Sequence, residues 1–151
     1  MDLTGQWADT LLALERLYLL KLTVWGALSV VVGTALIAVL QIRRLDSPLL
    51  GRFGLVTAAW GLATIATALW SRGALALRDL GGAVSLDRWL WFNIGLDAGF
   101  VLVGATLVLC GWKLGPRLAP HLGVVGAGLG IVVQALALGV LGLQLTADIV
   151  R

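Results

Sequence analysis

Four long stretches of apolar residues, separated by short polar segments, constrain this chain more than any other feature. They cover residues 22–42, 53–70, 89–112 and 122–147. Each is close to the ~20 residues that a helix needs to cross the hydrocarbon layer, and all are too long for barrel strands. A helix also satisfies its backbone hydrogen bonds internally, as lipid requires. The sequence therefore predicts an all-α, integral membrane four-helix bundle with short loops, forming one transmembrane domain over residues 1–151.

The composition agrees with a multi-pass membrane protein. Of 151 residues, 60% are hydrophobic and only 13% are charged, whereas about a quarter of the residues of a soluble domain are charged. So short a chain leaves much of its surface exposed, and a lipid bilayer must cover the apolar part. The net charge of +3 comes mainly from loops, where it suits anionic lipid. No basic stripe with interleaved aromatic residues indicates a nucleic-acid partner.

Local signals predict where the helices begin and end. The helices are expected near residues 10–42, 48–70, 86–112 and 120–147. Ser47 followed by Pro48 is typical of an N-cap with proline in the first turn. Ser85, with Asp87 in the first turn, is expected to begin the third helix, because a negative charge there suits the helix dipole. Gly81 and Gly82 would break any helix earlier in that connection.

A faint internal repeat suggests two related helical hairpins. Residues 32–36 resemble residues 103–107, and Gly54 and Gly61 of the second stretch align with Gly123 and Gly130 of the fourth. A true duplication would relate the hairpins by an axis along the membrane normal. Segments rich in Gly, Ala, Leu and Val also align by chance, so both interpretations stay open.

Charge in the loops bears on orientation. The loops at 43–52 and 113–121 carry five Lys and Arg residues, and the other side carries six. The number of Lys and Arg residues on each side therefore does not determine the orientation of the protein in the membrane. Because the two short loops are the denser clusters, we expect them in the cytoplasm, with both termini on the opposite side.

The third stretch contains one acidic residue, Asp97, well inside its predicted helix. A carboxylate in the membrane is costly and usually faces the bundle or a water-filled cavity. Asn93 lies four residues earlier, on the same helix face. The pair is either a proton, ion or ligand site or an interhelical hydrogen-bonding pair that fixes packing, and we favour packing. We expect both side chains to point toward Trp25, Gln144 or Lys21.

Three further polar residues complete a candidate intramembrane polar site. Lys21 enters the membrane from the same side as Asp97, Gln134 lies near the middle of the fourth helix, and Gln144 lies nearer to the Asp97 side. Lys21 can either extend to the surface or bend inward to pair with Asp97. Buried amides often hydrogen-bond across helices, and this role is favoured for both glutamines over ligand binding.

Small residues four apart form two helix-packing motifs. They are Gly95-x-x-x-Gly99 in the third helix and Gly126-x-x-x-Gly130 in the fourth. Such pairs let helix backbones approach closely. Packing inside the bundle is the favoured interpretation, and pairing with a second copy or with a partner helix is the alternative.

Motifs of known catalytic or metal chemistry are absent from the sequence. His121 is the only histidine and Cys110 the only cysteine, so we read them as an interfacial residue and an apolar filler, and we expect no metal or other cofactor. No phosphate-binding loop or hydrolase motif occurs. We therefore expect that the protein is not an enzyme.

The segment from Trp91 to Phe100, with Gly104, resembles the third helix of an uncharacterised family of small bacterial four-helix integral membrane proteins. The resemblance implies the same topology, a place in the bacterial inner membrane and weight on Asn93 and Asp97, but no activity. We expect a structural or accessory role, in association with itself or a larger membrane complex. The alternative is a small ion- or proton-coupled transporter or channel subunit that uses Asp97 and Asn93.

Overall fold

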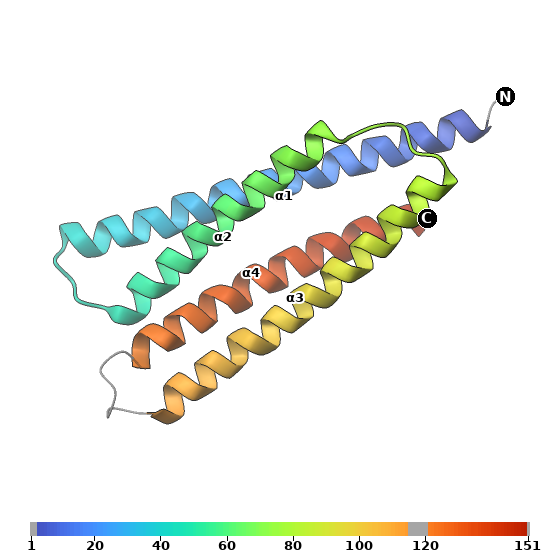
Figure 1. The fold of residues 1–151 in the computed structure, drawn as a ribbon. Helices are drawn as coiled ribbons and strands as arrows, with labels where there is room; N and C mark the ends of the chain where they lie inside the picture. The colour runs from blue at the N-terminus through green and yellow to red at the C-terminus, as the bar shows by residue number, and fades with distance from the viewer. Residues whose placement is uncertain (1–2, 115–120, 151) are drawn as a thin grey trace.

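The computed structural model describes residues 3–114 and 121–150, which form a bundle of long helices (Figure 1). In chain order, the helices of the described residues are α1 (Leu3–Ile42), α2 (Pro48–Gly73), α3 (Leu80–Leu114) and α4 (His121–Val150). Each contains a segment long and apolar enough to cross a membrane. The prediction of an all-α, four-span membrane bundle is confirmed.

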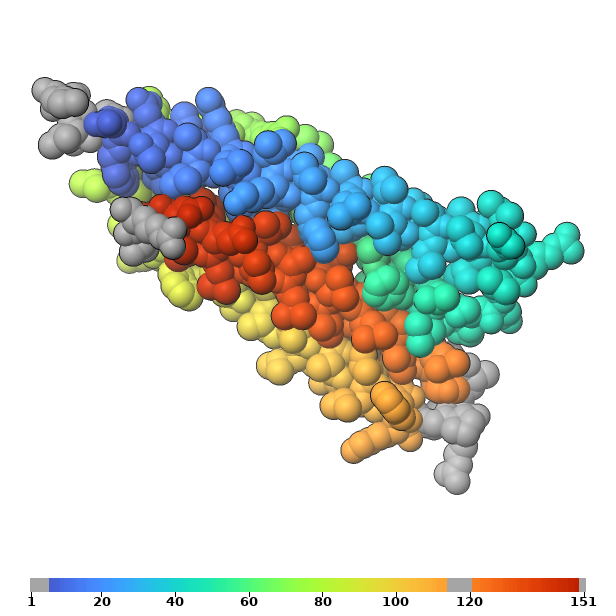
Figure 2. All heavy atoms as spheres, turned by 180° about the vertical axis from the view of Figure 1, so that it is seen from behind, coloured from blue at the N-terminus to red at the C-terminus, as the bar shows by residue number. Residues whose placement is uncertain are grey.

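The helices pack as two antiparallel hairpins. α1 packs along α2, and α3 packs along α4, while α2 and α4 form the main contact between the hairpins. α4 also touches α1 and runs between α1 and α3 in Figure 2. The start of α1, the end of α4 and the connection between α2 and α3 lie at one end of the bundle. We call this the terminal end.

The start of α2 follows the predicted local signal. Ser47 has an extended backbone, and its side chain accepts a hydrogen bond from the Leu50 amide at 3.4 Å. Pro48 occupies the first turn, where its missing N–H costs nothing. The prediction of an N-cap at Ser47 is confirmed.

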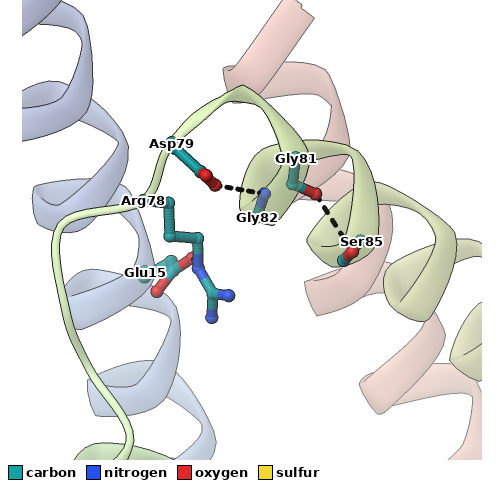
Figure 3. A network of polar contacts seen from close by, with 6 residues as sticks. All are labelled: Glu15, Arg78, Asp79, Gly81, Gly82 and Ser85. Carbon is teal, nitrogen blue, oxygen red and sulfur yellow. Dashed lines mark hydrogen bonds and ion pairs between the residues drawn. The ribbon is translucent and has the colours of Figure 1, made fainter.

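The start of α3 differs from the prediction. The helix begins at Leu80, so the expectations that Ser85 starts it and that Gly81 and Gly82 break it are wrong. Asp79 caps the helix: its carboxylate accepts a hydrogen bond from the Gly82 amide at 2.7 Å (Figure 3). The cap satisfies an amide that has no partner within the helix, and this offsets the low helix propensity of the two glycines.

Other helix ends also extend beyond the predicted ranges. α1 begins at Leu3 instead of near residue 10, α2 continues to Gly73, and α4 continues to Val150. These additions lie at the terminal end, so the helices project past the most apolar part of each span there. The predicted start of the last helix, residue 120, lies outside the described residues.

Glycines let α1 and α2 touch backbone to backbone. A Cβ atom at Gly33 would lie 2.5 Å from the carbonyl oxygen of Gly54, and one at Gly26 would lie 2.8 Å from that of Gly61. Real Cβ atoms do not approach so closely, so glycine is required for this helix spacing. The two contacts are seven residues apart on each helix, which is the period of a packed helical seam.

Glycines also bring the backbones of α3 and α4 into contact in the second hairpin. A Cβ atom at Gly104 would lie 2.7 Å from the carbonyl oxygen of Gly128, and one at Gly111 would lie 2.9 Å from that of His121. These contacts are again seven residues apart on each helix. Dispersion between closely apposed backbones stabilises helix pairs in lipid, where apolar burial alone contributes little.

The two hairpins are alike, but the glycines that the sequence repeat aligns do not all take equivalent places. Cβ atoms at Gly33 and at its aligned residue Gly104 would each meet a glycine carbonyl oxygen and the amide one turn later. The glycine that Gly33 meets is Gly54, whereas Gly104 meets Gly128. Gly123, which the repeat aligns with Gly54, lies against α2 instead of the other helix of its own hairpin. Gly54 and Gly123 are therefore not structurally equivalent.

Candidate functional site

The five residues of the predicted polar site do not form one cluster. Gln134 is the most buried of them, with 1% of its surface exposed. Its side-chain oxygen accepts a hydrogen bond from the indole N–H of Trp25 at 2.9 Å, and its amide nitrogen donates to the Ser29 hydroxyl at 3.1 Å. The contact joins α4 to α1 in the centre of the bundle. Both polar atoms of the Gln134 side chain have hydrogen-bond partners in α1, so the network joins the two helices.

Lys21 and Gln144 pair with each other. The Lys21 ammonium donates to the side-chain oxygen of Gln144 at 3.4 Å, joining α1 and α4 at an exposed position. Gln144 lies ten residues beyond Gln134, or about 15 Å along the helix. Among the described residues, no ion pair joins Lys21 to Asp97.

Asn93 is satisfied within its own helix. Its side-chain amide donates to the carbonyl oxygen of Trp89, one turn earlier in α3, at 2.7 Å. Such back-bonding needs no partner from another helix. Asn93 therefore does not make the predicted contact with Trp25, Gln144 or Lys21.

Asp97 occupies the seam between α3 and α4. It follows Leu90 and precedes Gly104 by seven residues each, and both of these residues are buried. A Cβ atom at Gly139 of α4 would lie 3.6 Å from the Asp97 Cβ. The carboxylate is half-buried and close enough to Tyr18 of α1 for an electrostatic interaction. Among the described residues, Asp97 has no hydrogen-bond or ion-pair partner.

The two predicted glycine motifs lie in different surroundings. Gly126 lies against the Leu49 backbone, and a Cβ atom at Gly130 would lie 3.0 Å from the Val56 side chain, so both residues pack α4 on α2. Cβ atoms at Gly95 and Gly99 would meet nothing within 4 Å. The favoured interpretation, packing inside the bundle, therefore applies to the motif of α4 and not to that of α3.

A cavity of about 320 Å³ at the terminal end was not predicted from the sequence. We call it the terminal cavity. Its lining includes Glu15 and Tyr18 of α1, Trp70 of α2, Arg78 of the connection, Trp89 of α3 and Leu145 of α4. Glu15 is only 4% exposed, and its carboxylate forms an ion pair with the Nε of Arg78 (Figure 3). The cavity thus combines apolar walls with a neutral pair of opposite charges.

A signal for Glu15 was present in the sequence. Leu11, Leu19 and Leu22 lie four residues before, four after and seven after Glu15, and all of them are buried. An acidic residue on such an apolar face needs a partner when the face is buried. Arg78 carried no comparable signal, because it lies 63 residues away in a connection.

The described residues hold no group of three His, Cys, Asp or Glu side chains that could bind a metal ion. Cys110 is exposed on α3. His121 begins α4 and supplies the backbone contact to Gly111 described above.

The model of a family of unknown function, DUF6992, matches residues 21–143, which is most of the chain; the match contains the second and third apolar spans and most of the first and fourth. No curated protein and no solved structure matches the chain.

Proposed function

Because the chain belongs to the DUF6992 family of unknown function, we propose its role from its own geometry. It is a non-enzymatic accessory membrane protein that pairs with a second copy of itself through the outward side of α3. One observation carries the proposal: Gly95 and Gly99 have open space where the glycines of the helix seams have a neighbouring backbone.

The surface concerned is the side of α3 that faces away from α4. Gly95 and Gly99 lie two residues before and two after Asp97, so each points about 160° away from the seam to α4. Residues at helical spacing continue this side, and we call the set the α3 outer face: Phe92, Gly95, Gly99, Leu102, Thr106 and Leu109. Phe92 is 64% exposed and Leu102 is 70% exposed. Large side chains therefore border a shallow small-residue centre.

A partner helix accounts for glycine at these positions. Glycine inside a helix costs about 1 kcal/mol relative to alanine. At Gly104 and Gly128, close backbone packing offsets that cost. At Gly95 and Gly99, no contact within the described residues offsets the cost of glycine. A helix docked on the α3 outer face would offset it.

A second copy is the partner that this surface fits. Copies inserted in one orientation present parallel α3 helices, related by a two-fold axis along the membrane normal. The outer face is then self-complementary, because Gly95 and Gly99 of one copy meet the same residues of the other. The bordering Phe92 and Leu102 would pack beside this contact.

The absence of convergent reactive groups supports a non-enzymatic role. Catalysis usually requires several ionisable groups that meet at one point. Within the described spans, Gln134 binds Trp25, Lys21 binds Gln144, and Asn93 binds its own helix. The first two contacts join α1 to α4 and the third lies within α3, and Tyr18 is the titratable group that the structure places near Asp97.

Asp97 itself favours a second candidate function. It is half-buried in a membrane-spanning helix without a hydrogen-bond or ion-pair partner among the described residues, and such carboxylates often mark ion or proton pathways. A transporter or channel subunit would use Asp97 as its titrating group. Asn93 contributes less, because its amide is bound to Trp89.

Energy transfer between labelled copies in liposomes tests the pairing. Donor- and acceptor-labelled protein is co-reconstituted and diluted with lipid until random encounters no longer contribute. The wild type should retain transfer, and Gly95→Leu should lose it, because the new side chain fills the centre of the contact. Ala66→Leu is the matched control, on an exposed position of α2. Ala66 lies at a depth similar to that of Gly95. The ring centroids of Trp60 in α2 and Phe100 in α3 are 5.0 Å apart. Because the two helices are antiparallel, Ala66, which follows Trp60, and Gly95, which precedes Phe100, lie on the same side of this contact.

Two outcomes would overturn the pairing. One is wild-type energy transfer that falls to the random level on dilution. The other is transfer that survives in Gly95→Leu as well as in Ala66→Leu. The melting temperature of each variant is measured alongside, so that misfolding is not mistaken for dissociation.

A further inference from the structure

We propose that the terminal cavity binds the head group of a zwitterionic phospholipid, with the phosphate on Arg78 and the ammonium on Glu15. The site is separate from the α3 outer face, and the proposal does not depend on pairing. It rests on the unused hydrogen-bonding groups of the buried ion pair, the size of the cavity and its position.

Arg78 has donors to spare. A guanidinium carries five N–H groups, of which the ion pair uses the one on Nε. Figure 3 shows the terminal nitrogens pointing away from Glu15, and among the described residues they have no hydrogen-bond partner. Arg78 also lines the cavity. Paired N–H groups in a fixed plane match two oxygens of a phosphate.

Glu15 has an acceptor to spare. Arg78 binds only one of its two carboxylate oxygens, and the other has no hydrogen-bond partner among the described residues. An ammonium group is its natural complement. Two aromatic residues that line the same cavity, Tyr18 and Trp89, present rings that favour a cation.

The net charge selects a zwitterion over a simple ion. The Glu15–Arg78 pair is neutral as a unit, and Glu15 is almost fully buried. A lone anion in the cavity would be attracted by Arg78 but repelled by Glu15. A lone cation would be attracted by Glu15 but repelled by Arg78. A head group with both charges satisfies each partner at once.

The size and place of the cavity fit a head group. Its volume of about 320 Å³ lies at the lower end of the range for ligand pockets, about 300–1,000 Å³. That volume suits a head group but not two acyl chains. Trp70 lines the cavity and is 85% exposed near the end of α2, where tryptophan marks the membrane–water boundary. The acyl chains would therefore run in the surrounding bilayer, along α2 and α3.

Binding of short-chain lipids to the purified full-length protein tests the site. Dioctanoyl phosphatidylethanolamine and dioctanoyl phosphatidylglycerol, which has the same chains and no ammonium, are titrated into protein in detergent. The dissociation constants come from native mass spectrometry. We expect the ethanolamine lipid to bind more tightly. Soluble glycerophosphoethanolamine, which has the same charges and no chains, should bind more weakly than the lipid.

Arg78→Gln should weaken binding of the ethanolamine lipid by about tenfold or more, because it removes charge-assisted hydrogen bonds. The matched control is Arg72→Gln, which removes an exposed cation outside the cavity and should leave the constant within about twofold. If Glu15 left unpaired prevents folding, the double variant Glu15→Gln/Arg78→Gln removes both charges together. It should abolish the preference for ethanolamine over glycerol.

Three results would overturn the proposal. The first is equal or tighter binding of the glycerol lipid by the wild type. The second is an unchanged preference in Arg78→Gln or in the double variant. The third is binding of glycerophosphoethanolamine as tight as that of the lipid, which would assign the cavity to a soluble compound.

Discussion

The inner and outer sides of α3 carry similar residues, but the inner side is packed against α4 and the outer side is open. On the inner side, Gly104 and Gly111 lie against the backbone of α4. On the outer side, Gly95 and Gly99 face open space. All four are helix-interior glycines in an apolar stretch, so composition does not separate them. What separates them is their position relative to the seven-residue seam on which α4 packs.

The same seam explains the position of Asp97. Leu90, Asp97, Gly104 and Gly111 follow one another at intervals of seven residues, so Asp97 faces α4 where its neighbours in the seam are packed. Gly139 lies opposite and provides room for the carboxylate. The inner side of α3 thus combines tight glycine contacts with one accommodated acidic group.

The largest expected effect comes from adding the same side chain to each side of α3. Gly104→Leu should lower the free energy of unfolding by about 3 kcal/mol or more, because its Cβ would overlap the Gly128 carbonyl. Gly95→Leu should stay within about 1 kcal/mol of the wild type. Unfolding of both variants is followed in detergent, under conditions that keep the protein monomeric. Equal losses would remove the distinction between the two sides.

A smaller effect is expected where α4 packs on α2. Gly126→Ala should destabilise the protein by about 1–3 kcal/mol, because the added methyl group would overlap the Leu49 backbone. Gly99→Ala is the control, and it should be neutral or stabilising by up to about 1 kcal/mol, as helix propensity predicts. The same unfolding measurement applies. A stable Gly126→Ala protein would show that α2 and α4 are not packed this closely.

The buried amide network between α1 and α4 should contribute less. Gln134→Leu removes the partner of Trp25 and Ser29, and we expect a loss of about 1 kcal/mol, the scale of polar contacts between membrane helices. Gln144→Leu breaks only the exposed contact with Lys21 and should cost less. If Gln144→Leu lowered the free energy of unfolding more than Gln134→Leu, burial would not explain the contribution of the Gln134 contact to stability.

The smallest effect on stability is expected for Asp97→Asn. The carboxylate makes no hydrogen bond to lose among the described residues, and an asparagine fits the space beside Gly139, so the change should stay below about 1 kcal/mol. Proton and cation flux in proteoliposomes should be equally low for the wild type and the variant. A flux that depends on Asp97 would instead establish the transporter or channel function.

The sequence predicted the features of the fold that depend on neighbouring residues or on the overall apolarity of a stretch. The four spans followed from the length and apolarity of each stretch, and the cap at Ser47 from two adjacent residues. The sequence did not predict the start of α3, because two adjacent glycines usually interrupt a helix and their cost is offset here by the side-chain cap from Asp79. The Glu15–Arg78 pair was missed because its members are 63 residues apart. The surroundings of Gly95 and Gly99 required knowing which side of α3 meets α4.

Disulfide cross-linking in native membranes tests the proposed self-association most directly. On a Cys110→Ser background, Leu102→Cys places a thiol on the α3 outer face, and Ala59→Cys places one on an exposed position of α2 at similar depth. Under mild oxidation, Leu102→Cys should form covalent dimers, and Ala59→Cys should remain monomeric. Equal cross-linking at the two positions, or stronger cross-linking at Ala59→Cys, would contradict pairing through α3.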